Sequence, residues 1–189
     1  MMTRLALLGL VAIGAVSCAQ TPPPPPPAPP PSKAVTASLK TQLDDMKDYF
    51  LKSAALMPEK DYGFRPAGVA KEVRTFGEIL GHVANENYVF CAASSGEKFT
   101  SPDAEKTLAT KQADMTKALA DSFAFCERAF AALDDQKGGE PAEIPQFGMK
   151  STKLGMLAAN TSHDNEHYGN LVTYFRAKGM VPPSSAPAK

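Results

Sequence analysis

The placement of the prolines constrains the fold of this chain more than any other sequence feature. Nine of the 17 prolines fall within residues 22–31, and long proline-free runs follow at 67–101, 103–140 and 146–181. These runs are rich in Ala, Leu, Met, Lys and Glu, which favour helices, whereas Val and Ile are too sparse for the core of a sheet. The sequence therefore predicts an all-α fold, and 189 residues suit one domain of modest size.

Net charge excludes one class of function. The chain has 20 Lys and Arg residues against 20 Asp and Glu residues, and residues 1–19 carry only one charge, on Arg4. The balance therefore survives removal of that segment. A nucleic-acid-binding protein normally shows an excess of basic residues, so we expect no nucleic-acid partner.

The first residues resemble an export signal. Residues 5–16 form an unbroken run of 12 apolar residues and glycines, too short to span a bilayer. Signal peptidase could cut after Ala19, which gives a signal peptide of residues 1–19. Alternatively, residues 15–18 (AVSC) resemble a bacterial lipobox, although Ala15 stands where Leu is usual, and a signal of residues 1–17 would then leave Cys18 lipidated. Both sites stay open, and each predicts a bacterial protein outside the cytoplasm, in the periplasm or cell envelope.

Two segments outside the helical region are expected to lack a packed structure. Residues 20–37 form a proline-rich linker, and the ten residues at 22–31 would span roughly 30 Å as a semi-rigid polyproline spacer. A lipidated Cys18 would need such a tether, and this anchor is the membrane contact that we expect. The tail at residues 182–189 contains three prolines and is predicted to be disordered.

Four helices are predicted between the linker and the tail, within a domain of residues 38–181. Apolar residues recur at steps of three and four over 38–57, 76–93, 101–134 and 151–178. Thr75 and Glu78 form a capping box at the start of the second helix, and Pro102 suits the first turn of the third. Residues 59–74 and 135–150 contain glycines and prolines and are predicted to be loops. Four helices of these lengths bury a core best as a bundle.

The three histidines are the candidate metal ligands. His163 and His167 are four residues apart, so they project side by side from one helix, and His82 lies on another helix. Two imidazoles in this arrangement can hold one metal ion, and a third would leave a coordination position open, as in catalytic sites. Histidines without a role at the edge of the apolar stripe are the alternative.

Other polar residues near these histidines are weaker candidates. Residues 163–167 (HDNEH) match the H-x-x-E-H pattern of inverted zinc proteases, but no Asp or Glu follows His167 to supply the further carboxylate ligand, so this interpretation is rejected. Glu86, Asp164 and Asn160 lie on the inward sides of their helices. Such a carboxylate could act as a base or as the partner of an imidazole, or could simply pair with a neighbouring helix. None is assigned as catalytic.

Four segments together resemble the DinB-like family: residues 64–66 (FRP), 74–84 (RTFGEILGHVA), 163–170 (HDNEHYGN) and 175–179 (FRAKG). The resemblance covers about residues 38–183. It implies a four-helix bundle of up-down-down-up order with metal ligands at His82, His163 and His167. It also implies one divalent ion of the Zn, Ni or Fe type.

Cys91 and Cys126 remain once Cys18 is lipidated or removed, and an exported protein with two cysteines suggests a disulfide. If their helices formed an antiparallel hairpin, the two residues would lie about 30 Å apart, at 1.5 Å per residue. If the helices run parallel, both cysteines lie near the same end. The up-down-down-up order implied by the resemblance is the parallel case, so a structural bridge is expected, with two buried free thiols as the alternative.

The sequence leaves the reaction open. We expect an exported metalloprotein that acts on an unidentified small molecule, as a metal-dependent hydrolase or transferase. Some members of the family use low-molecular-weight thiols inside the cell, and export argues against that use here. A pocket lined by Phe90, Met156 or Tyr174 would favour an enzyme. A non-catalytic metal-binding or stress-related module at the cell envelope is the alternative, and such bundles often form homodimers.

Overall fold

The protein is described from a computed structural model that covers residue 30 and residues 32–187. The expected export signal, with Cys18, and residues 20–29 of the expected linker lie outside the described residues. Within them the fold is mostly helical, as predicted. The long helices are α1 (Ala34–Leu56), α2 (Phe76–Ser95), α4 (Gln112–Ala131) and α6 (Lys153–Ala177). The first therefore begins four residues before the expected domain boundary at 38.

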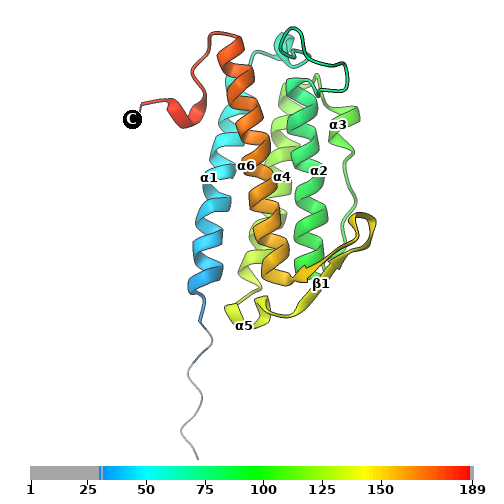
Figure 1. The fold of residues 1–189 in the computed structure, drawn as a ribbon, viewed down its shortest axis with the longest axis vertical. Coiled ribbons are helices and arrows are strands. Elements are labelled where there is room, and N and C mark those ends of the chain that lie inside the picture. The colour runs from blue at the N-terminus through cyan, green and yellow to red at the C-terminus, as the bar shows by residue number, and fades with distance from the viewer. Residues whose placement is uncertain (1–29, 31, 188–189) are drawn as a thin grey trace, which may run out of the picture. The chain divides into compact units, whose positions relative to one another are not determined.

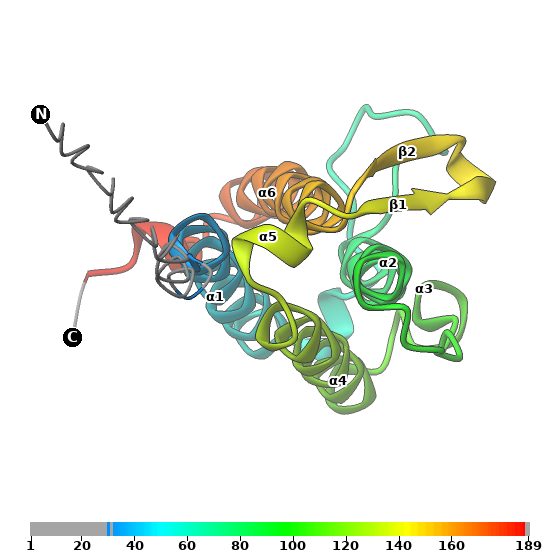
Figure 2. The same ribbon diagram turned by 90° about the horizontal axis from the view of Figure 1, so that it is seen from below.

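The long helices lie side by side around one core (Figure 1). Helices α1 and α6 run in one direction, and α2 and α4 run in the other. Each of α1 and α2 contacts both α4 and α6, and the view along the helices shows the four arranged around the core (Figure 2). The core is mainly apolar and contains many aromatic side chains, with a few buried polar residues such as Asn87, Ser122 and Asn160. Its largest fully buried side chains include Phe50, Phe76, Phe123, Phe175, Leu43, Leu80 and Leu119.

Helix boundaries follow local chemistry where the sequence carried a signal. The capping box at the start of α2 is confirmed, because the Thr75 side chain accepts from Glu78 N and the Glu78 carboxylate accepts from Thr75 N. The Thr152 hydroxyl caps α6 by accepting from Gly155 N. After α6 the backbone turns at Gly179, whose φ of 69° suits a residue without a side chain.

The third predicted helix, over residues 101–134, is wrong as a continuous element. The structure has a short helix α3 (Ala104–Thr107) and then α4, separated by residues 108–111. The Gln112 side-chain amide donates to the carbonyls of Ala54 and Met57, where α1 ends. Tertiary hydrogen bonds to α1 thus fix where α4 begins, and they override the local helical periodicity of this region.

Residues 135–150, predicted to be a loop, also form regular structure. A short helix α5 (Asp135–Gly138) precedes an antiparallel hairpin of β1 (Pro141–Ile144) and β2 (Met149–Thr152), with the 3₁₀ turn η2 (Pro145–Phe147) between the strands. Ile144 is buried with Phe90 and Met156, and this small apolar cluster attaches the hairpin to α2 and α6. The expectation of an all-α fold is therefore corrected by one two-stranded sheet.

Two further 3₁₀ turns complete the described chain: η1 (Glu59–Asp61) follows α1, and η3 (Pro183–Ser185) lies in the segment predicted to be disordered. Ser184 N donates to the hydroxyl of Tyr168, and η3 contacts α1. No helix within the described range is long and apolar enough to span a membrane.

Candidate metal centre

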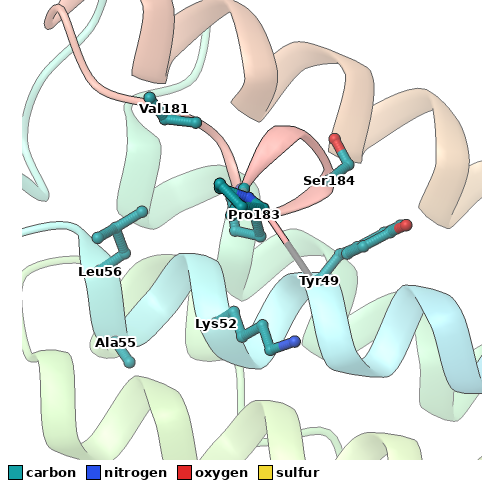
Figure 3. Close-up of a pocket in the computed structure, with 9 residues that line it drawn as sticks. Tyr49, Lys52, Ala55, Leu56, Val181, Pro183 and Ser184 are labelled. Atoms are coloured by element: carbon teal, nitrogen blue, oxygen red, sulfur yellow. The ribbon is translucent and has the colours of Figure 1, made fainter. Parts of the chain in front are cut away.

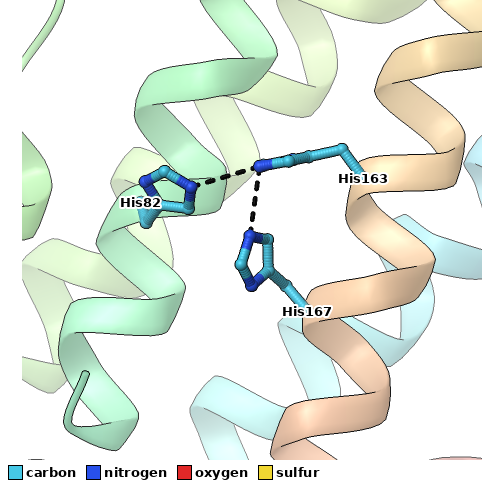
Figure 4. Close-up of side chains that lie close together, drawn as sticks. All are labelled: His82, His163 and His167. Carbon is cyan, nitrogen blue, oxygen red and sulfur yellow. Dashed lines mark hydrogen bonds between the residues drawn. The ribbon is translucent and has the colours of Figure 1, made fainter. Parts of the chain in front are cut away.

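The structure brings the three candidate histidines together. His82 comes from the second turn of α2, and His163 and His167 come from successive turns of α6 (Figure 4). His163 Nε2 lies 3.1 Å from His82 Nε2 and 3.1 Å from His167 Nε2. One ring nitrogen of each residue lies within 4.8 Å of the other two. His163 is therefore the central member of the group.

All three imidazoles are held in the form that a metal requires. Burial lowers the pKa of His82 to about 4, helped by the positive charge of Arg74 and by the other two histidines. Burial also lowers the pKa of His167 to about 4 and lowers the pKa of His163. Neutral imidazole is the ligand form of histidine, so at neutral pH no proton has to be removed from a charged ring before binding.

The arrangement fits a tetrahedral ion. Nitrogens bound at 2.0–2.1 Å to one tetrahedral ion lie about 3.3–3.4 Å apart. The two separations of 3.1 Å need a small opening to reach that value, and the third pair of ring nitrogens, which lies within 4.8 Å, has to adjust to it as well. Three convergent neutral imidazoles are the donor set of borderline metals such as zinc, and three protein ligands leave one position open. These residues can therefore hold one metal ion.

The outer nitrogen of His82 has charged partners that the sequence analysis missed. Glu105, on α3, places Oε2 at 3.2 Å from His82 Nδ1, and Arg74 Nε donates to Glu105 Oε1 at 2.7 Å. Arg74 Nη2 also lies 3.3 Å from His82 Nδ1. With a metal on Nε2, the proton of His82 sits on Nδ1 and donates to Glu105, which fixes the ring.

Glu105 reaches this position because α3 packs against α2 without an intervening side chain. A Cβ on Gly81 would lie 2.5 Å from the backbone nitrogen and from the Cα of Glu105. A Cβ on Gly77 would lie 1.8 Å from Ala109 O. Gly77 and Gly81 lie one helical turn apart and precede His82, and they were the available sequence signal for this contact.

The inward carboxylates named from the sequence lie near the histidines but touch them less closely. Asp164 is fully buried, and burial raises its pKa well above the ordinary value. Glu86 is half-buried, and burial raises its pKa too. In the described part of the chain, neither Asp164 Oδ1 nor Glu86 Oε2 has a hydrogen-bond partner. Asn160 donates to Asp164 Oδ2 at 3.3 Å.

The two cysteines of the helical region are joined by a disulfide. Cys91 and Cys126 lie in the later turns of α2 and α4, with Cα atoms 5.1 Å apart. Both are fully buried. The bridge is possible because α2 and α4 run parallel, so residues at similar depth in the two helices meet.

The residues proposed to line a substrate pocket are mostly buried. Phe90, Met156 and Tyr174 are each exposed by 6% or less, and the Phe90 ring centroid lies 5.7 Å from that of His163. A separate groove of about 800 Å³ lies between α1 and the C-terminal segment (Figure 3). Tyr49, Lys52, Leu56 and Val181 line it with other residues, and it includes none of the histidines.

Comparison with known proteins places the chain. The family model described as the DinB superfamily matches residues 42–171, which is more than half of the sequence. The chain belongs to the DinB superfamily. No curated protein sequence matches this DinB chain.

Several solved structures share the fold. A DinB-like protein from Bacillus cereus has 16% identity and a TM-score of 0.65, and the match covers 78% of this chain and 95% of that one. A DinB-like protein from Bacillus subtilis has 15% identity and a TM-score of 0.57, over 76% and 93%. A mycothiol-dependent maleylpyruvate isomerase has 15% identity and a TM-score of 0.56, and this chain spans only 60% of its length. At these identities the likeness shows the fold alone.

Proposed function

We propose that this DinB protein binds one divalent transition metal ion through His82, His163 and His167. The supporting observation is the convergence of the three Nε2 atoms from two helices. The proposed frame is a four-helix bundle of up-down-down-up order. We further propose that the protein is exported and works in the cell envelope, which rests on the sequence of residues 1–19 alone.

The catalytic form of the proposal is a metal-dependent hydrolase or transferase that acts on a small molecule. A bound ion would supply Lewis-acid activation to the group in the open coordination position. Two groups of residues would support this site. Glu105 orients the His82 ring, and the apolar side chains of Phe90 and Met156 limit the access of water behind His163. One structural neighbour is a mycothiol-dependent isomerase, but the proposed export argues against a thiol cofactor of that kind here, so hydrolysis is the form that we favour.

A non-catalytic metal-binding module is the second candidate, and one observation favours it. The side chains of His82 and His163 are only 17% and 18% exposed. Little ligand surface is therefore open to a substrate. A buried metal with a closed fourth position would stabilise the fold without catalysing a reaction.

Metal content of the purified protein, measured by elemental mass spectrometry, tests the proposal. We expect about one equivalent of a transition metal in the wild type. The double variant His163→Ala/His167→Ala should lose it. Glu166→Gln is the matched control, because Glu166 is exposed on the same turn of α6 and should leave the metal in place. A wild-type protein that stays metal-free after supplementation with zinc, nickel and iron would refute metal binding.

The same preparations separate the two candidates. Small anions such as azide enter an open coordination position and shift the visible spectrum of a cobalt-substituted site. An unchanged spectrum at saturating azide would indicate a closed site and favour the module. A shift would favour the enzyme and justify a screen of hydrolase substrates.

A further inference from the structure

The three histidines differ in what their outer nitrogens contact. His82 Nδ1 lies 3.2 Å from the Glu105 carboxylate. His167 Nδ1 lies 3.5 Å from the side-chain amide nitrogen of Asn170. His163 Nδ1 is buried, and it has no hydrogen-bond partner among the described residues. Buried polar atoms in native proteins are nearly always paired, so this unpaired atom requires an explanation.

The carboxyl group nearest to His163 Nδ1 is that of its own neighbour in the chain. Asp164 Oδ1 lies 3.8 Å from His163 Nδ1. It is also buried and, like His163 Nδ1, lacks a partner within the described chain. Two buried unpaired atoms of complementary type thus face each other, about 1 Å beyond the usual length of a hydrogen bond.

We propose that Asp164 is a positioning residue for the metal centre and accepts a hydrogen bond from Nδ1–H of His163 when His163 Nε2 binds the metal. This inference rests on the proposed metal binding. An imidazole that ligates through Nε2 carries its proton on Nδ1, and a carboxylate that accepts this proton fixes both the tautomer and the ring orientation.

Hydrogen bonds that reach its other oxygen, Oδ2, fix the position of the Asp164 side chain. Asn160 Nδ2 donates to Asp164 Oδ2 at 3.3 Å and to Asn87 Oδ1 at 2.9 Å. Asn87 Nδ2 donates to Ser122 Oγ at 3.1 Å, and this hydroxyl donates to Leu119 O. The chain of hydrogen bonds therefore crosses the core from α4 through α2 to α6. It keeps Oδ2 of Asp164 occupied and leaves Oδ1 for His163.

His163 is the ligand that lies close to both of the others. Both Nε2 separations of 3.1 Å run to His163, so the orientation of its ring sets both close contacts. Its ring also packs beside Phe90, which supplies no hydrogen bond. A fixed Nδ1 contact is the remaining way to hold this ring.

Glu86 is the competing partner and supplies the matched control. It faces His163 from α2, and its Oε2 is buried without a partner in the described chain. The structure gives it no hydrogen bond to His163. Asp164→Asn and Glu86→Gln each replace a carboxyl group with an amide at nearly constant shape, so they compare the two carboxyl groups directly.

The test is zinc affinity of the full protein, measured by competition with a chromogenic chelator. Asp164→Asn should weaken zinc binding about 10–100-fold, the range for loss of an outer partner of a metal ligand. The reason is geometric. Asn160 donates toward residue 164 and holds the new amide oxygen, so the new NH₂ group faces Nδ1–H of His163. Glu86→Gln removes a charge that acts on His163 without a hydrogen bond, and it should weaken zinc binding less than Asp164→Asn. Equal affinity of Asp164→Asn and wild type, or a loss confined to Glu86→Gln, overturns the inference.

A second measurement uses only the wild-type protein, so it does not depend on whether a variant folds. In the zinc-loaded wild type, the Nδ1 proton of His163 should give a slowly exchanging, hydrogen-bonded resonance in imidazole ¹⁵N-correlated NMR spectra. A zinc-loaded protein in which this proton exchanges as fast as in free imidazole contradicts the role of Asp164, while metal binding itself stands. A wild type that binds no zinc refutes the metal site and this inference together.

Discussion

Helix α2 has two sides of different chemistry. On the side that faces α4, the helix is joined to α4 by the Cys91–Cys126 disulfide and by a hydrogen bond from Asn87 to Ser122. Toward α6 and α3, it presents His82, whose partners are other titratable groups. Among the described residues, buried atoms without a hydrogen-bond partner include His163 Nδ1 and Asp164 Oδ1 near this second side, and Ser94 Oγ on α2 itself. The comparison indicates that the α4 side mainly serves stability and the α6 side is arranged for a ligand, and the hydrogen bond from Asn160 to Asn87 joins the two.

Removing the disulfide should produce the largest effect on stability and should test whether the two sides are independent. The bridge closes a loop of 35 residues, so Cys91→Ala/Cys126→Ala should lower the free energy of unfolding by about 3–4 kcal/mol. Chemical denaturation under oxidising conditions measures this loss. Zinc affinity at 10 °C should stay as in the wild type. A parallel loss of zinc affinity in a folded variant would show that the two sides are coupled.

Only part of this difference between the two sides of α2 could be predicted from the sequence. The spacing of His163 and His167 predicts their juxtaposition, because one helical turn separates them. His82 was a candidate because it lies on another predicted helix of the bundle, and the family resemblance then implied its ligand position, since no local rule brings it to α6. The histidines on the side of α2 that faces α6 were therefore predicted from the sequence as candidate ligands.

The outer partners could not be predicted in the same way. Glu105 lies 23 residues from His82 in the chain, in a segment whose periodicity predicted one long helix. Its position depends on the break between α3 and α4, which hydrogen bonds from Gln112 to the end of α1 produce. Such contacts join segments far apart in sequence and leave no periodic signal. The hairpin after α5 was missed for the same reason, because Ile144 is fixed by packing on Phe90.

The next largest effect on stability should come from adding one methyl group on the side of α2 that faces α3. In Gly81→Ala, the new Cβ would meet backbone atoms of Glu105, so α3 must move away. We expect a loss of about 1–3 kcal/mol of unfolding free energy, typical of overpacking, together with weaker zinc binding as Glu105 leaves His82.

Gly169→Ala is the control for this substitution. Gly169 lies within α6, and a Cβ there would meet no atom within 4 Å. Alanine in this open helical position should stabilise the protein by about 0.5–1 kcal/mol and leave zinc affinity unchanged. If Gly81→Ala behaves like this control, then α3 is not held against α2 as closely as the structure shows.

The smallest effect at neutral pH should be that of the histidines on the metal-free fold, and it should appear only on acidification. Burial lowers the pKa of His82 and His167 from 6.5 to about 4, so between these values the unfolded chain binds protons that the folded protein does not. Their contribution to stability is therefore complete above about pH 6.5 and is lost as the pH falls toward 4. Thermal melting from pH 7.5 to 4 should show a steeper decline for the metal-free wild type than for His82→Asn/His167→Asn. Carboxylates titrate in both proteins, so the difference between the two curves isolates the histidines. Parallel curves would mean that these rings are not held neutral by burial, and the contrast between the two sides of α2 would then rest on geometry alone.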